Sequence, residues 1–168
     1  MNLYRGRGAL LVAFLLGSES TVLAQDTLSG RDTYWVGAGV GAGSEDFAGH
    51  LNISYQSGAN LFSLRTAGTA GIFSDGFGDV ALLYGRATRA PERYQAAVAV
   101  GLAVADGCDG GGLGGCRERP SVIGFPLEAQ AFWRPSKIFG VGLYGFADIN
   151  HLHSFAGVTL GIQLGRLR

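Results

Sequence analysis

The clearest structural signal in the chain is the stretch 156–165, which reads AGVTLGIQLG. Every second residue from Ala156 to Leu164 is apolar, and the residues between them are glycine, threonine or glutamine. Successive side chains of a β-strand point to opposite faces, so this alternation predicts a strand with one apolar face and one small, polar face. An amphipathic helix would instead repeat its apolar residues every three or four positions.

The same alternation recurs in seven segments upstream, and residues that favour turns separate them. We therefore predict an all-β fold, an eight-stranded antiparallel up-and-down barrel. The predicted strands are 33–43, 46–56, 60–71, 77–87, 93–105, 121–133, 137–149 and 154–166. The longest predicted connection is 106–120.

The two faces of these strands indicate which solvent surrounds the barrel. The apolar face carries no charge, whereas the other face is mostly Gly, Ala, Ser, Thr, Asn and Gln. A soluble barrel would carry Lys and Glu outside, while small residues suit the narrow interior of eight strands. The apolar face is therefore predicted to lie outside, against lipid. The alternative is a soluble, secreted, lipocalin-like barrel whose apolar rows face inward and bind an apolar ligand.

Aromatic residues provide an independent indication of a membrane. If the first strand starts on the periplasmic side, the outward residue nearest that side is aromatic in strands one to seven. These residues are Tyr34, Tyr55, Phe62, Tyr84, Tyr94, Trp133 and Phe139. Aromatic rings form such girdles where a transmembrane barrel crosses the membrane–water boundary.

The N-terminus resembles a secretory signal peptide. Arg5 and Arg7 precede an apolar run at 9–17, and small residues end at Ala24. The run is shorter than the roughly 20 residues of a spanning helix, which disfavours a membrane anchor. We predict a signal peptide at 1–24, a short segment at 25–32 and the barrel at 33–168, exported to the outer membrane.

Across residues 33–166 the chain resembles the small eight-stranded outer-membrane barrels of the OmpA and OmpX type. The resemblance is one of pattern and carries no diagnostic motif. It implies a structural or surface-interaction role in a Gram-negative envelope, contact with outer-membrane lipid, and no enzymatic activity. The chain departs from that family in ending GRLR, where members usually end on an aromatic residue.

Four polar residues are predicted to face the lumen, namely Arg65, Asp79, Glu128 and Gln130. An isolated buried charge costs several kcal/mol, so these charges are expected to be paired. Because eight strands leave little room for water, we predict a plug of polar side chains and no open pore. The alternative for these residues is a gate or a proton path.

Cys108 and Cys116 flank a glycine-rich run in the predicted connection 106–120. Two cysteines in one loop of an exported protein predict a disulfide. Two sulfurs without a histidine nearby in sequence do not make a tetrahedral metal site, and the run lacks the residues of a phosphate-binding loop. We expect no metal or other cofactor. Loop 106–120 is the predicted contact surface for an extracellular or envelope protein.

His151, His153 and Ser154 are weak catalytic candidates in the last predicted connection. Lipid A deacylases of the outer membrane use a His and a Ser near this rim, but their His-x-Ser-Asn pattern is not present here. No carboxylate follows to orient an imidazole, and Asp148 would have to rearrange to do so. A lipid-modifying enzyme is therefore only an alternative. Nucleic acid is excluded as a partner by the balance of 13 basic and 13 acidic residues.

Overall fold

The computed structural model describes residues 32–71, 76–89, 93–109 and 117–168. The predicted signal peptide 1–24 and residues 25–31 lie outside this part of the chain. No helix in the described ranges is long and apolar enough to cross a membrane. The eight strands are β1 (Thr33–Gly43), β2 (Asp46–Ser57), β3 (Asn60–Ala70), β4 (Gly76–Ala87), β5 (Tyr94–Asp109), β6 (Arg117–Trp133), β7 (Phe139–Ile149) and β8 (Phe155–Arg166).

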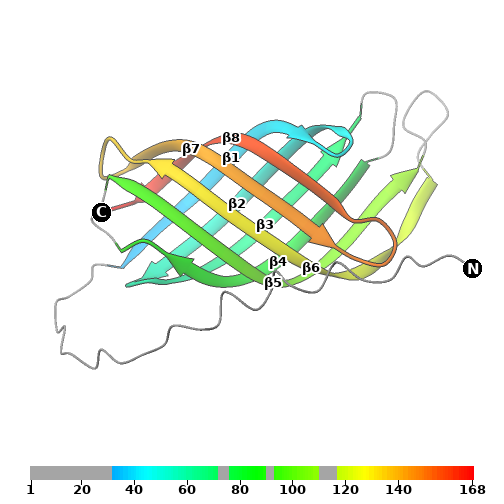
Figure 1. Cartoon of the computed structure of the whole chain (residues 1–168), viewed down its shortest axis with the longest axis horizontal. Coiled ribbons are helices and arrows are strands. Elements are labelled where there is room, and N and C mark those ends of the chain that lie inside the picture. The colour runs from blue at the N-terminus through cyan, green and yellow to red at the C-terminus, as the bar shows by residue number, and fades with distance from the viewer. Residues whose placement is uncertain (1–31, 72–75, 90–92, 110–116) are drawn as a thin grey trace, which may run out of the picture.

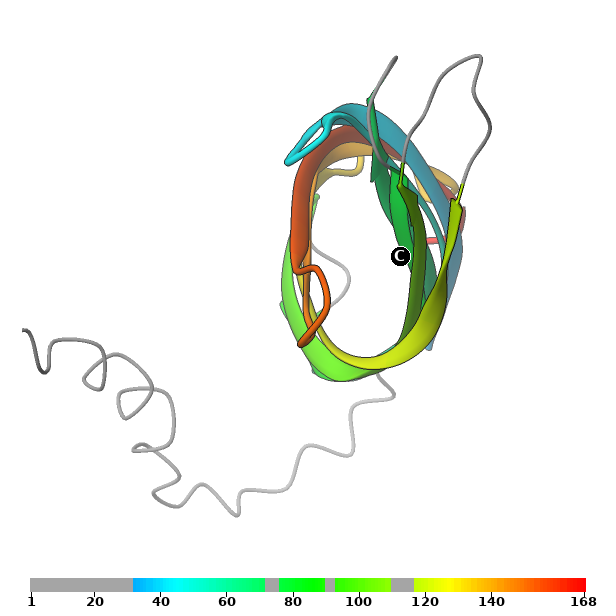
Figure 2. The same cartoon turned by 90° about the vertical axis from the view of Figure 1, so that its right-hand side faces the viewer.

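These strands form one closed, antiparallel barrel in which each strand pairs with its neighbours in sequence. The barrel closes where β1 pairs with β8, from Tyr34 opposite Arg166 to Gly43 opposite Gly157. The strands cross the barrel obliquely in Figure 1, and Figure 2 shows the closed ring. The predicted fold is thus confirmed. We call the end where β1 begins and β8 ends the terminal end, and the opposite end the hairpin end.

The β5–β6 hairpin is longer than predicted. Pairing continues past Gly107 to Asp109 opposite Arg117, so the connection is 110–116 and the predicted boundaries of loop 106–120 are wrong. The reason is a register shift between Ala105 and Gly107, which interrupts the alternation used to find the strand ends. The other predicted strand ends agree with the structure to within two residues.

Burial follows the predicted faces. On β5, Val100 and Leu102 are 59% and 61% exposed on the outside, whereas Ala99 and Ala103 are each 4% exposed in the lumen. A barrel with its apolar rows inside, as the soluble lipocalin-like alternative requires, is therefore wrong for this chain. The outward face is a belt of large apolar side chains.

In the lumen, aromatic rings of some strands lie over glycines of other strands. A Cβ at Gly39 on β1 would collide with the His50 ring, and one at Gly157 on β8 would collide with Phe146. Glycine at these positions therefore leaves the space that the large side chains of other strands occupy. The expectation of a lumen filled by small residues is incomplete, because six aromatic side chains are also buried there: Trp35, Phe77, Phe132, Tyr144, Phe146 and Phe155.

Candidate functional site: the polar lumen and the pocket at the hairpin end

An ion pair lies in the middle of the lumen. Arg65 on β3 donates from Nη2 to Oδ2 of Asp79 on β4, and both side chains are fully buried. The Arg65 Nη1 also donates to the carbonyl of Leu127 on β6, at 2.9 Å. The guanidinium therefore joins β3, β4 and β6, and β6 is a neighbour of neither β3 nor β4 in the barrel. Two of the four predicted lumen residues are brought together in this way.

The other two predicted lumen residues form a second pair. Glu128 accepts hydrogen bonds from the Gln130 amide on the same strand and from the Tyr144 hydroxyl on β7. The Tyr144 ring stacks on His50 at 3.8 Å between centroids, and the His50 Nδ1 lies 2.7 Å from the Thr159 hydroxyl. Hydrogen bonds and ring stacking thus link β2, β6, β7 and β8 across the lumen.

A second cation lies in the lumen at the terminal end, and the sequence analysis did not single it out. Arg134 is 2% exposed and points inward. It donates to the side-chain oxygens of Gln95 and Gln163 and to the carbonyl of Leu167, and it lies 4.8 Å from the Trp35 ring centroid. The alternation of β6, continued by one residue past Trp133, would have placed it inside.

Arg134 remains a cation at neutral pH despite its burial. Desolvation, and secondarily the nearby Arg168, lower the pKa of Arg134 to about 10. Its partners are neutral oxygens and the face of an indole ring, both of which stabilise a guanidinium. Arg134 is therefore a buried cation that lies across the terminal end of the lumen, and we call this residue with its partners the Arg134 floor.

Glutamine side chains connect the central residues to this floor. The Gln163 amide donates to Gln130 at 3.1 Å and to Gln95 at 3.3 Å, and Gln95 donates to Gln56 at 3.2 Å. With Gln130 bonded to Glu128, the chain of hydrogen bonds runs from mid-lumen to the end of β2. Because amides do not titrate, this arrangement favours the plug over a proton path.

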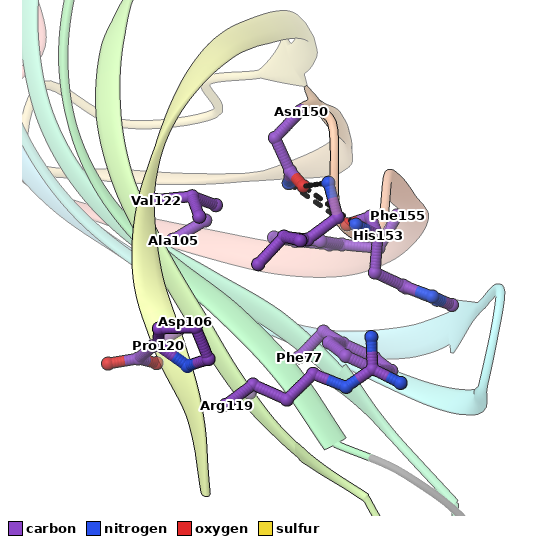
Figure 3. Close-up of a pocket in the computed structure, with 11 residues that line it drawn as sticks. Phe77, Ala105, Asp106, Arg119, Pro120, Val122, Asn150, His153 and Phe155 are labelled. Atoms are coloured by element: carbon purple, nitrogen blue, oxygen red, sulfur yellow. Dashed lines mark hydrogen bonds between the residues drawn. The ribbon is translucent and has the colours of Figure 1, made fainter.

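The hairpin end has a small pocket inside the mouth of the barrel (Figure 3). The His153 ring stacks on Phe77 at 3.8 Å between centroids, and its Nε2 lies 3.4 Å from a carboxylate oxygen of Glu45. The Arg119 guanidinium lies 5.8 Å from the same phenyl ring. Apolar side chains complete the lining, among them Val122, Leu152 and Phe155.

The three weak catalytic candidates are not assembled into a catalytic site. The hydroxyl of Ser154 hydrogen-bonds the backbone of Asn150, at 3.1 and 3.2 Å, and in the described part of the chain it contacts no imidazole. His151 is exposed, and His153 is engaged with Phe77 and Glu45. This geometry gives no support to acyl-transfer chemistry at the rim.

Asp148, which would have to rearrange to orient an imidazole, is held inside the barrel. It is fully buried, because it has the inward parity of β7. Its Oδ1 accepts a hydrogen bond from Asn150 at 2.8 Å, and its carboxylate occupies the space above Gly124. It therefore anchors the β7–β8 connection from inside the barrel.

The predicted disulfide stays a prediction. Cys108 lies near the end of β5, and Cys116 lies outside the described residues. Among the residues that the structure describes, no group of three or more His, Cys, Asp or Glu side chains is placed to hold a metal ion.

The seven residues of the predicted aromatic girdle are all exposed on the outside of the barrel. Tyr34, Tyr55, Phe62 and Tyr84 are opposite one another in successive strand pairs, and ring centroids lie 6.5 Å apart for Tyr55–Phe62 and 5.1 Å apart for Phe62–Tyr84. Tyr94 pairs with Trp133, and Phe139 pairs with Leu164, the one aliphatic residue of the series. The row follows the terminal end of the barrel.

Three solved structures with the same architecture are small eight-stranded outer-membrane barrels. The chain is similar to Neisserial surface protein A (TM-score 0.55, 7% identity, 79% of this chain and 94% of that one). It is similar to the N-terminal β-barrel domain of Pseudomonas aeruginosa OprF (TM-score 0.61, 10%, 79% and 96%). It is also similar to Ail, the attachment invasion locus protein of Yersinia pestis (TM-score 0.55, 12%, 80% and 97%).

No family model and no curated protein sequence matches the chain. The similarity is therefore one of structure at low sequence identity. It establishes that this chain has the fold of the small eight-stranded outer-membrane barrels.

Proposed function

We propose that the chain is an outer-membrane protein with a closed lumen, which acts through the protein surface at its hairpin end. The observation that carries this proposal is the extended β5–β6 hairpin. β6 pairs with β5 from Arg117 onward, but it pairs with β7 only from Phe125 onward. Residues 117–124 therefore form a strand with a neighbour on one side alone among the described residues.

A one-sided strand of this kind is a surface for protein contacts. Its edge away from β5 has no pairing strand among the described residues, and an extended segment of another protein can add to a strand edge of this kind. Pro120 lies in this edge and lacks an N–H, which limits how far such pairing can run. Two of the similar structures are described as a surface protein and an attachment invasion locus protein, which supports a surface role.

The lumen supports the first part of the proposal, that the barrel is closed. The Arg65–Asp79 pair, the glutamine chain and the Arg134 floor occupy the lumen at successive levels. We expect the purified protein in planar lipid bilayers to show no steady ion conductance. Stable open-channel steps in the wild type would contradict a closed lumen.

Site-specific photo-crosslinking in whole cells tests the surface role. A photoreactive residue at the exposed position Ser121 lies on the one-sided strand, and one at Val158 lies on the apolar outside of β8. We expect crosslinked protein adducts from Ser121 and none from Val158. The surface role would be refuted if Ser121 gave no protein adduct, or if both positions gave the same adducts.

A further inference from the structure

A shallow apolar groove lies on the outward face of β5, β6 and β7, near the terminal end. These strands lie side by side on the face turned to the viewer in Figure 1. The groove follows from side-chain size, because Ala96 is opposite Ala131 and Ala131 is opposite Leu143 in the strand pairs. The larger side chains of Tyr94, Trp133, Leu143 and Leu160 surround these alanines.

One end of this groove is polar. Thr88, the first residue after β4, lines this end of the groove, and its N–H donates to the carbonyl of Ala96 at 2.8 Å. Arg89 follows Thr88 directly and is exposed. The lining therefore passes from alanines and aromatic rings to a threonine, and a cation is the next residue in the chain.

A second arginine lies at the same end of the groove. Arg93 precedes Tyr94 and is exposed. Its carbonyl accepts a hydrogen bond from the N–H of Arg134 at 2.7 Å, one residue beyond the Tyr94–Trp133 pair toward the terminal end. Among the described side chains at the terminal end, Asp32 carries the one carboxylate, and its hydrogen bond is with Tyr55 on β2. The two described charged side chains next to the groove's polar end, Arg89 and Arg93, are thus both cations, and Glu92 of the same connection lies outside the described residues.

We propose that this groove binds one anionic glycerophospholipid of the leaflet at the terminal end. Its acyl chain lies over Ala96 and Ala131, and its phosphate is held by Arg89 and Arg93. Guanidinium groups bind phosphate through paired, charge-assisted hydrogen bonds, and the aromatic pair lies at the level expected for the acyl–headgroup boundary. The inference rests on the membrane location given under the proposed function.

Native mass spectrometry of the full chain, released from detergent with added lipid, tests this inference. The probes are phosphatidylglycerol and phosphatidylcholine of the same acyl composition. We expect the wild type to retain one phosphatidylglycerol in clear preference. R89Q/R93Q should lower that retention about tenfold through lost charged hydrogen bonds, and A131F should lower it by filling the groove.

Two variants serve as matched controls. R86Q/R166Q removes two charges at the same end. The Arg86 guanidinium is held toward β3 by a 3.0 Å hydrogen bond to Asn60, and Arg166 is on β8, opposite Tyr34 of β1. A38F adds the same side chain at an outward alanine of β1. Both controls should retain the lipid as the wild type does.

Three outcomes would overturn the inference: equal retention of both lipids, unchanged retention in R89Q/R93Q and A131F, or a second copy of the chain in place of lipid. A heat-dependent shift in gel mobility reports whether each variant forms the closed barrel. If the wild type itself lacks that shift and is found outside the membrane fraction, the proposed function fails first, which separates the two failures.

Discussion

Arg65 and Asp79 show how a charge is accommodated inside this barrel. The alternation of β3 and β4 predicts that both side chains point inward. Their pairing depends on register, because Asp79 is opposite Ala67, two residues from Arg65. Register across strands is a property of the closed barrel, so the sequence indicates that these charges need partners without identifying them.

Breaking this pair should destabilise the barrel strongly. Asp79→Ala leaves a buried guanidinium without its counter-ion, and we expect the free energy of unfolding to fall by about 3–5 kcal/mol. The double variant R65L/D79L removes both charges and should recover most of the loss. Equilibrium urea unfolding in lipid vesicles measures both values. Equal destabilisation by the single and double variants would show that the charges are not coupled.

Two glycines offer a matched test of how closely the lumen is packed. A Cβ at Gly39 would collide with the His50 ring and the Leu160 carbonyl, whereas a Cβ at Gly49, on the outside, meets its nearest atom at 3.8 Å. Gly39→Ala should therefore cost about 1–3 kcal/mol of unfolding free energy, and Gly49→Ala should be near neutral. The same unfolding assay compares them, and similar values for both would contradict the packing described.

At the scale of elements, the sequence predicted the strands where alternation was unbroken and failed where it was interrupted. The bounds of β1 were predicted to the residue, since its turn residues follow directly on the alternating run. β5 and β6 were cut short at the register shift near Ala105. Arg134 and Asp148 were not singled out as lumen residues, although strand parity continues to both of them and both are buried.

The β5–β6 hairpin carries the cysteine prediction. If Cys108 and Cys116 form a disulfide in the exported protein, a thiol-reactive polymer should add to the folded chain only after reduction, and then twice. C108S should add one polymer without reduction. Two additions to the unreduced wild type would contradict the disulfide. Gel electrophoresis resolves the three species by mass.

At the scale of the whole molecule, the solvent around the barrel decides the cost of an outward charge. Val100 and Val104 are on the same strand, have exposures of 59% and 56%, and differ in depth, since Val100 is midway between Tyr94 and Asp106. In a bilayer, Val100→Arg should cost about 2–4 kcal/mol and Val104→Arg distinctly less. Urea unfolding in vesicles measures the difference, and equal small effects would indicate water on this face.

The most direct test of the central claim, an apolar face turned to lipid around a closed barrel, combines membrane fractionation with electrophoresis of boiled and unboiled samples. We predict that the protein is extracted from the outer membrane by detergent and that its band shifts on boiling, as the closed barrel unfolds. A protein recovered in the soluble fraction, with no shift on boiling, would contradict the claim.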